Sequence, residues 1–152
     1  MTDVEPHELP DDAAEMLQTF LENEHDFLSW LGFQVDEFDS GRMVGTIPFD
    51  GKLTNPTEPP TMQGGVASTL IDVVGGIALR PYLTDPIGDR IATINLNVNY
   101  LRPAASDLTA SAEVVRAGGS VGVSAVEVSS ETPDGEEVLV AVGQGAYRLF
   151  RS

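Results

Sequence analysis

Apolar and polar residues recur with different periods along this chain, and each change of period marks a new structural element. The first part predicts a helix over 13–30, where apolar residues repeat at helical spacing and Asp11 or Asp12 can cap the first turn. Two strand-like runs follow, over 33–38 and 43–49, and a loop rich in turn-forming residues comes after them.

The loop covers residues 50–62, and a second helix is predicted after it. Residues 64–79 read GGVASTLIDVVGGIAL, with no proline and one charged residue, Asp72. This run is too long for a typical strand and is apolar on nearly every side. The pattern therefore predicts a buried helix rather than a helix on the surface.

Alternation with a period of two dominates the remainder of the chain. Apolar residues of 94–100 alternate with Asn95, Asn97 and Asn99, and Thr93 falls on the face of these asparagines. Further strands are predicted over 108–114, 121–128 and 138–150. The fold class is therefore α+β: an antiparallel six-stranded sheet around one long helix, with an extra N-terminal helix and the last four strands in a meander.

The length of 152 residues fits one domain, which we expect to span 11–152. Residues 1–10 hold two prolines and no apolar pattern, and they predict a flexible acidic N-terminus. No apolar run approaches the length of a membrane span, and no signal segment opens the sequence. We therefore expect a cytoplasmic protein that does not bind membranes.

The net charge of −16 narrows the possible partners. Eight Lys and Arg face 24 Asp and Glu, and such a surface repels the phosphates of nucleic acids. Residues 1–41 hold twelve carboxylates and no Lys or Arg. This acidity is typical of halophilic surfaces, and an acidic arm for a basic partner is the alternative interpretation. On the halophilic interpretation, high salt should raise stability by screening this repulsion.

Cysteine and histidine are too scarce for several common chemistries. The chain has no cysteine, which excludes disulfides and thiolate nucleophiles. His7 and His25 both lie in the acidic N-terminal stretch and are expected on the surface. A Ser-His-Asp triad and a metal site are therefore not expected.

Two features of the predicted buried helix could carry chemistry. Asp72 is a carboxylate in apolar surroundings and could act as a general base; alternatively, it is a structural aspartate bonded to Ser68 or Thr69. Gly64 and Gly65 open the helix and could bare N–H groups to an oxyanion, or could simply form a permissive turn.

The spacing of these two features predicts a dimer. Eight residues separate Gly64 from Asp72, which is about 12 Å along a helix. A base and an oxyanion donor must each come within about 3 Å of one reacting carbonyl. If both groups act, Asp72 of one subunit must meet Gly64 of another across a two-fold axis.

The segments MQGGVASTLIDVVGGIALRPYL and ATINLNVNYLRPA resemble hot-dog-fold acyl-CoA thioesterases of the phenylacetic-acid-degradation (PaaI) type. The resemblance extends over roughly residues 30–150. It implies hydrolysis of an acyl- or aryl-acyl-CoA to a free carboxylate and CoA, without a cofactor. It also implies dimers that pair into tetramers, with each active site shared between two subunits.

The resemblance also assigns roles to individual residues. Asp72 matches the catalytic carboxylate as general base or nucleophile, Gly64 the glycine whose amide polarises the thioester, and Thr93 the residue that places the attacking water. Gly65 follows in the same glycine pair. The segments that hold CoA match these residues: Arg102, Pro103, Arg116, Gly119 and Ser120.

The sequence departs from the family pattern at two places. Gln63 stands where the family has a histidine, and Thr57 stands where it often has Asn or Gln. Asn55 is the nearest substitute, displaced by an insertion around Pro59-Pro60. These departures support the alternative of an acyl-CoA-binding module that does not hydrolyse its ligand. A hydratase or dehydratase on this fold usually needs a site histidine, which the predicted core lacks.

Overall fold

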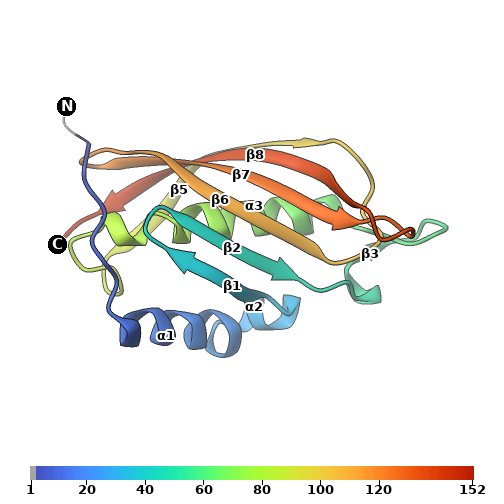
Figure 1. Cartoon of the computed structure of the whole chain (residues 1–152), viewed down its shortest axis with the longest axis horizontal. Helices are drawn as coiled ribbons and strands as arrows, with labels where there is room; N and C mark the ends of the chain where they lie inside the picture. The colour runs from blue at the N-terminus through green and yellow to red at the C-terminus, as the bar shows by residue number, and fades with distance from the viewer. Residues whose placement is uncertain (1–2) are drawn as a thin grey trace.

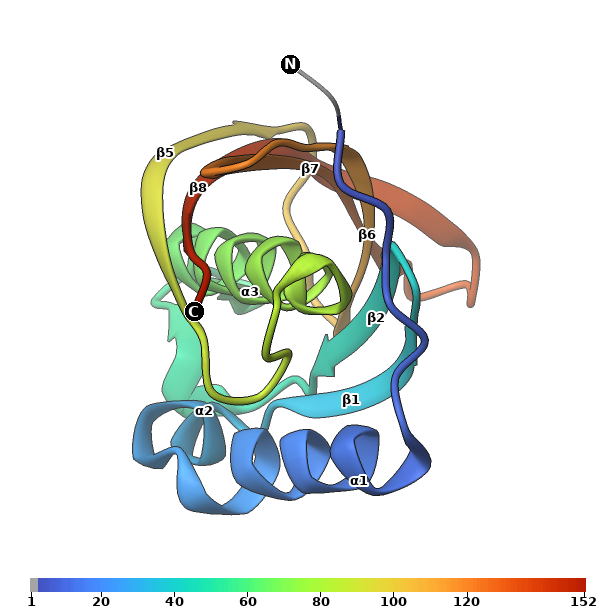
Figure 2. The same cartoon turned by 90° about the vertical axis from the view of Figure 1, so that its left-hand side faces the viewer.

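Helix α3, Gly64–Ile77, lies inside the curve of a six-stranded antiparallel sheet (Figures 1 and 2). This computed structural model describes residues 3–152. The strands stand in the order β1-β2-β6-β7-β8-β5. Their bounds are β1 Gln34–Asp39, β2 Arg42–Ile47, β5 Arg90–Tyr100, β6 Leu108–Ala117, β7 Val121–Glu131 and β8 Glu137–Phe150. The predicted hot-dog architecture, with its buried central helix, is confirmed.

Apolar side chains on the buried face of α3 form the centre of the core. Leu70, Ile71 and Val74 are completely buried, and they belong to one cluster with Met43 and Val128 of the sheet. Burying each such side chain stabilises the fold by about 1.5–3 kcal/mol. A helix with so few polar side chains is expected to be buried, and here the sheet curls around it, which explains the apolar pattern.

The strand order differs from the predicted four-strand meander. Strands β6, β7 and β8 do follow one another, but β5 pairs with β8 at the edge, and β2 takes the place beside β6. The cause is the segment 101–107, which carries the chain from the edge strand across to β6. Two short paired strands, β3 Thr54–Asn55 and β4 Thr61–Met62, also lie within the segment predicted as a loop.

The N-terminal arm, residues 11–31, is broken where one continuous helix was predicted. It consists of α1 Asp11–Thr19, a π-helical turn Phe20–Glu24 and α2 Asp26–Leu31. The break falls at His25, whose backbone is extended and whose Nδ1 accepts the Leu28 N–H at 3.3 Å. His25 is half-buried and caps a helix, so the expectation of a surface histidine is wrong there, whereas His7 is exposed as predicted.

The two edges of the sheet differ in how they are covered. The arm lies along β1 (Figure 2), and the Glu22 carboxylate accepts the N–H of Val35 in that strand at 2.8 Å. Strand β5 forms the other edge, and no strand of residues 3–152 pairs with its outer side. Two large apolar side chains of β5 are exposed, Ile94 by 57% and Tyr100 by 55%. One edge is thus occupied and the other is open.

Residues 3–10 run along the outside of the domain (Figure 2). The N–H of Val4 donates to the carbonyl of Ala117 at 2.8 Å, and the N–H of His7 donates to that of Pro81 at 2.7 Å. Flexibility of residues 1–10, of which 1 and 2 lie outside the described residues, stays a prediction. Within residues 3–152, no helix combines the length and apolar character that crossing a membrane requires.

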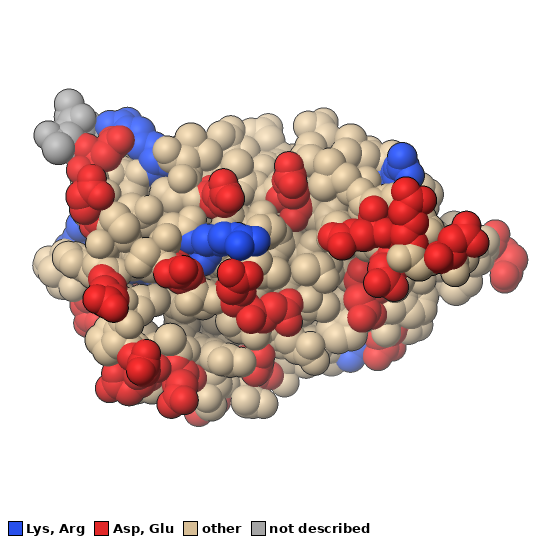
Figure 3. All heavy atoms as spheres, viewed as in Figure 1, with Lys and Arg blue, Asp and Glu red and all other residues tan. Residues whose placement is uncertain are grey.

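Acidic side chains are spread over the face shown in Figure 3, where basic groups occupy a few isolated places. Two ion pairs join described residues: Arg42 with Glu37 at 3.3 Å and Arg116 with Asp3 at 2.7 Å. Both pairs are exposed, and such pairs contribute about 0–1 kcal/mol each. Most carboxylates therefore face solvent without a cationic partner.

Candidate active site

Asp72 lies on α3, half-buried, with its carboxylate held by a neighbouring strand. The Thr93 hydroxyl of β5 donates to Asp72 Oδ1 at 2.7 Å. Ser68 instead bonds the hydroxyl of Tyr100, and Thr69 donates to the carbonyl of Gly65. The structural alternative, in which Ser68 or Thr69 binds Asp72, is therefore wrong. Oδ2 accepts no hydrogen bond from residues 3–152 and is free to face a ligand.

A β-bulge in β5 turns Thr93 toward the helix. Thr93 pairs with Tyr147 of β8 and Asn95 pairs with the next residue, Ala146, so Ile94 is the extra residue. Because side chains of paired residues share a face, Thr93 points inward with the buried Tyr147. The prediction that Thr93 shares the outer face of the asparagines is wrong, since strict alternation fails at a bulge.

Tyr147 is a contributor that the sequence did not reveal. Its hydroxyl donates to the backbone carbonyl of Asp72 at 2.9 Å. Burial, and then the nearby Asp72 carboxylate, raise the pKa of this hydroxyl, which keeps it a donor at neutral pH. A Cβ on Gly75 or Gly145 would lie within 2.5 Å of the Tyr147 hydroxyl oxygen. These glycines, one in α3 and one in β8, leave room for the Tyr147 ring and were the only sign of it in the sequence.

The Asp72 pocket is a cavity of about 230 Å³ beside this carboxylate. Helix α3 and strand β5 supply one side of it, and the N-terminal arm supplies the other. Its lining residues are Phe20, Leu21, His25, Leu28, Asp72, Val73, Gly76, Ile77, Arg80, Ile91, Thr93 and Tyr147. Asp72 and Thr93 thus share this pocket with apolar side chains and with two further polar ones, His25 and Arg80.

The opposite end of α3 presents one free backbone donor. Gln63 occupies the N-cap, and its Oε1 accepts the N–H of Gly65 at 2.5 Å. The N–H of Gly64 donates to no group of residues 3–152. This is usual for the first N–H of a helix, which has no acceptor within the helix. Of the two predicted glycines, Gly64 therefore offers its N–H and Gly65 does not. Gln63 replaces the family histidine without occupying the Gly64 donor.

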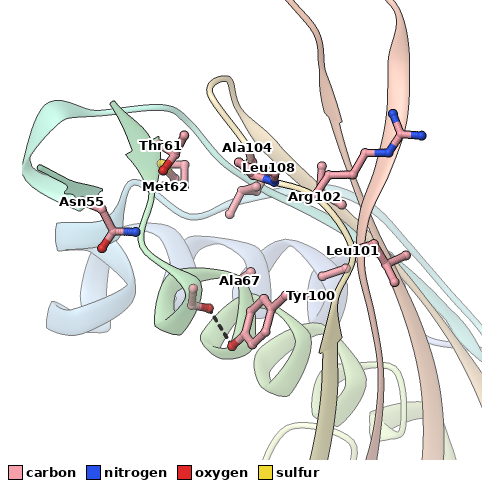
Figure 4. Close-up of a pocket in the computed structure, with 13 residues that line it drawn as sticks. Asn55, Thr61, Met62, Ala67, Tyr100, Leu101, Arg102, Ala104 and Leu108 are labelled. Atoms are coloured by element: carbon pink, nitrogen blue, oxygen red, sulfur yellow. Dashed lines mark hydrogen bonds between the residues drawn. The ribbon is translucent and has the colours of Figure 1, made fainter. Parts of the chain in front are cut away.

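Tyr100 holds the Gly64 peptide in place and was also missed in the sequence. Its hydroxyl donates to the carbonyl of Gly64 at 3.0 Å (Figure 4) and bonds Ser68 on the next turn. A Cβ on Gly64 would lie 3.2 Å from the Tyr100 ring, so the ring packs directly on the glycine. Thirty-six residues separate the two along the chain, and a local sequence pattern cannot show this contact.

The Gly64 pocket is a separate cavity of about 410 Å³ (Figure 4). Asn55, Arg102 and Pro103 line it together with Gly64, so the structure assembles four of the predicted residues. The insertion before Gln63 therefore does not remove Asn55 from this end of the helix. The other lining residues are Thr61, Met62, Ala67, Tyr100, Leu101, Ala104, Leu108, Val140 and Ala141.

The second predicted CoA segment lies at the other end of the sheet. Arg102 precedes β6, whereas Arg116, Gly119 and Ser120 lie at its far end. Arg116 binds Asp3, and Arg151 donates to the carbonyl of Gly119. None of these three residues lines the Asp72 pocket or the Gly64 pocket. Their role in holding CoA stays a prediction.

Asp72 and Gly64 thus line different pockets of one chain, two turns apart on the same helix, or about 12 Å. One subunit cannot place both groups on one carbonyl. Among residues 3–152, no cluster of His, Asp or Glu is arranged to bind a metal ion.

Comparisons with family models, with protein sequences and with solved structures all match thioesterases or esterases. The thioesterase superfamily model matches residues 60–137. A Halobacterium salinarum protein, provisionally named an esterase, is 47% identical over 145 residues, which cover 93% of this chain and 95% of that protein. The medium/long-chain acyl-CoA thioesterase YigI of Escherichia coli is 32% identical over 100 residues, 58% of this chain and 62% of YigI.

A solved structure from Shewanella oneidensis, described as related to the thioesterase superfamily, aligns with a TM-score of 0.77 and 25% identity. The alignment covers 91% of this chain and 95% of that structure. The matched family segment contains Asp72, Gly64 and Thr93, and it excludes the N-terminal arm.

Proposed function

This chain belongs to the thioesterase superfamily, and on that premise we propose that it hydrolyses acyl-CoA thioesters. The observation that carries the proposal is the hydrogen bond from Thr93 to Asp72, which fixes a carboxylate at the edge of a pocket. The free Gly64 N–H supplies the second requirement, a donor for an oxyanion. The acyl-CoA thioesterase activity in the name of YigI supports this substrate class.

The chemistry needs only groups of this chain, water and the thioester. As a general base, Asp72 takes a proton from water through its free Oδ2 while the water oxygen bonds to the thioester carbon. The Gly64 N–H stabilises the resulting oxyanion. Collapse of the oxyanion breaks the C–S bond, and the leaving CoA thiolate takes the proton from Asp72, which restores the carboxylate. Alternatively, Asp72 attacks as a nucleophile and water hydrolyses the resulting anhydride.

The open edge of β5 provides the geometry for a shared site. If two copies pair antiparallel through β5 with the two-fold axis near Asn97, residue 93 lies opposite residue 101 of the other copy. Thr93 marks the Asp72 pocket, and Leu101 lines the Gly64 pocket. The Asp72 pocket of one subunit then meets the Gly64 pocket of its partner. This pairing also covers the exposed side chains of Ile94 and Tyr100.

The same pairing brings the two predicted CoA segments together. Strand pairing places Ala117 in one row with Gly122, Tyr147 and Thr93, so the turn after β6 lies at the Thr93 end of the sheet. In the dimer this end faces the partner's Arg102. Arg116, Gly119 and Ser120 of one subunit would then flank CoA together with the partner's Arg102 and Pro103. Arginine suits the phosphates of CoA.

Replacing Asp72 by asparagine tests the proposed hydrolysis. Asp72→Asn keeps the side-chain shape but cannot take up a proton, so we expect kcat to fall by about 10²–10⁴-fold. Release of CoA from a panel of acyl-CoAs, followed with a thiol reagent, measures the rates. Asp134→Asn in the exposed β7–β8 turn serves as the matched control and should retain wild-type rates.

Equal rates for wild type and Asp72→Asn would show that the mechanism is wrong. If calorimetry instead shows tight acyl-CoA binding while no member of the panel is hydrolysed, the chain is a binding module rather than an enzyme.

A further inference from the structure

We propose that the N-terminal arm forms the wall that limits the size of the acyl group, and that Phe20 is the limiting residue. This inference rests on the proposed function, since it concerns the substrate of the same site. The arm lies outside the family segment 60–137, whereas the proposed catalytic residues lie inside it. A wall supplied from outside the shared segment can differ between relatives without altering the chemistry.

The assignment of the acyl group to the Asp72 pocket follows from the arginine in each cavity. The side chain of Arg102 makes no hydrogen bond or ion pair among residues 3–152, whereas that of Arg80 is bound to backbone carbonyls. A thioester bound between them has two substituents, the acyl group and the CoA arm. The Gly64 pocket has Asn55 and Arg102 in its lining, which suits the polar, anionic CoA side. The Asp72 pocket is walled by Val73, Ile77 and Ile91 behind the carboxylate, which suits the acyl side.

The arginine at the Asp72 pocket is already bound by backbone carbonyls and is not available to a phosphate. Arg80 lines the pocket, but its Nη1 donates to the carbonyls of Pro86 at 2.9 Å and Asp89 at 3.0 Å. Desolvation by burial lowers the pKa of Arg80, with Asp85 and Asp89 opposing that effect. The guanidinium is thus anchored to the 85–89 loop. Its Nε is buried without a partner among residues 3–152, and the apolar walls of Val73, Ile77 and Ile91 suit an acyl chain.

The arm contributes four side chains to the pocket, and Phe20 differs from the others. Leu21 and Leu28 are buried in the core, and His25 caps α2. Phe20 is 46% exposed and meets the His25 ring edge-on at a centroid distance of 6.1 Å. It lies in the π-helical turn, a feature common at functional sites. Its ring can therefore be truncated with little effect on the core while the pocket gains space.

Phe27 offers a matched control for this test. It lies on the same arm, is 51% exposed and does not line the Asp72 pocket. The experiment compares wild type, Phe20→Ala and Phe27→Ala in kcat/KM for a series of straight-chain acyl-CoAs of increasing length. We expect Phe20→Ala to raise the ratio of long-chain to short-chain kcat/KM by roughly tenfold, since added hydrocarbon in an apolar pocket changes kcat/KM by such factors. Phe27→Ala should keep the wild-type profile.

Identical length profiles for Phe20→Ala and Phe27→Ala would overturn the inference, while hydrolysis by wild type would leave the proposed function intact. If wild type binds acyl-CoAs without hydrolysing them, the proposed function fails. The dependence of Kd on chain length, measured by calorimetry in the same three proteins, then decides the role of Phe20. Absence of both hydrolysis and binding overturns both.

Discussion

Gly64 meets two requirements at a single position. Its Cα carries no side chain, which lets the Tyr100 ring pack against it, and its N–H is the unpaired donor at the start of α3. Only the packing of Tyr100 calls for glycine here, since any residue except proline carries the N–H. The two can be separated because different substitutions remove them.

Gly64→Pro and Gly64→Ala separate these two properties. Proline removes the N–H at the first helical position, where it is favoured, and the extended backbone of Gln63 suits a residue before proline. We expect kcat to fall by about 10²–10³-fold, the cost of losing one oxyanion donor. Alanine adds the same Cβ but keeps the N–H, so its loss of kcat should be much smaller. Steady-state kinetics on one acyl-CoA measures kcat of both variants. Similar losses of kcat in the two would show that the Gly64 N–H is not the oxyanion donor.

Among single residues, the sequence predicts the proposed catalytic groups better than the side chains that hold them in place. Asp72 stands out as the lone charge of an apolar run, and the spacing to Gly64 already indicates two subunits. Tyr100 and Tyr147 do not stand out, because each acts through a backbone carbonyl 36 or 75 residues away. Such contacts depend on strand pairing, which a single sequence does not encode locally.

Elements were predictable where one period persisted without interruption. Helix α3 begins at Gly64 as predicted, because its apolar pattern is continuous and its first turn is glycine-rich. Strand β5 was predicted as a strand, but the extra residue Ile94 inverts the face on which Thr93 lies. A bulge leaves the composition of a strand unchanged, so only the register with β8 reveals it.

The arm shows a second reason why element boundaries escape prediction. Apolar residues keep helical spacing through Phe20 and Leu28, yet the backbone forms a π-helical turn and then breaks at His25. The spacing survives because Leu21 and Leu28 still bury against the core. Periodicity thus reports which side chains face inward, and it does not report whether the backbone between them is continuous.

A subunit-mixing experiment tests the shared site for the whole molecule. Homodimers of Asp72→Asn and of Gly64→Pro should both be nearly inactive. A heterodimer of the two holds one doubly altered site and one intact site, because each site takes Asp72 from one chain and Gly64 from the other. Random pairing of equal amounts should therefore restore about a quarter of wild-type activity.

Co-expression of the two variants with different affinity tags, followed by purification on both tags, yields the heterodimer alone. Because one of its two sites is intact, it should show about half of wild-type activity. Mixing after separate purification, without exchange of subunits, is the control and should show no recovery. No recovery in the purified heterodimer would place both groups on one chain.

Salt dependence tests the meaning of the acidic surface. With a net charge of −16 and few ion pairs among the described residues, self-repulsion opposes the folded state. The screening length falls from about 10 Å at 0.1 M salt to about 3 Å at 1 M. We therefore expect the melting temperature to rise from low to molar KCl, as circular dichroism can follow. A flat or falling melting temperature would contradict this interpretation.

The N-terminal arm lies against the β1 edge of the sheet and accepts the N–H of Val35 through Glu22. A sheet with two open edges can add copies at both and grow into a fibre, especially in salt that suppresses repulsion between chains. Here the arm occupies the β1 edge, so only the β5 edge of the described residues is open to pairing with another strand. If two copies pair through β5 as proposed, association through sheet edges ends with the second copy, because the arm leaves no second edge for pairing.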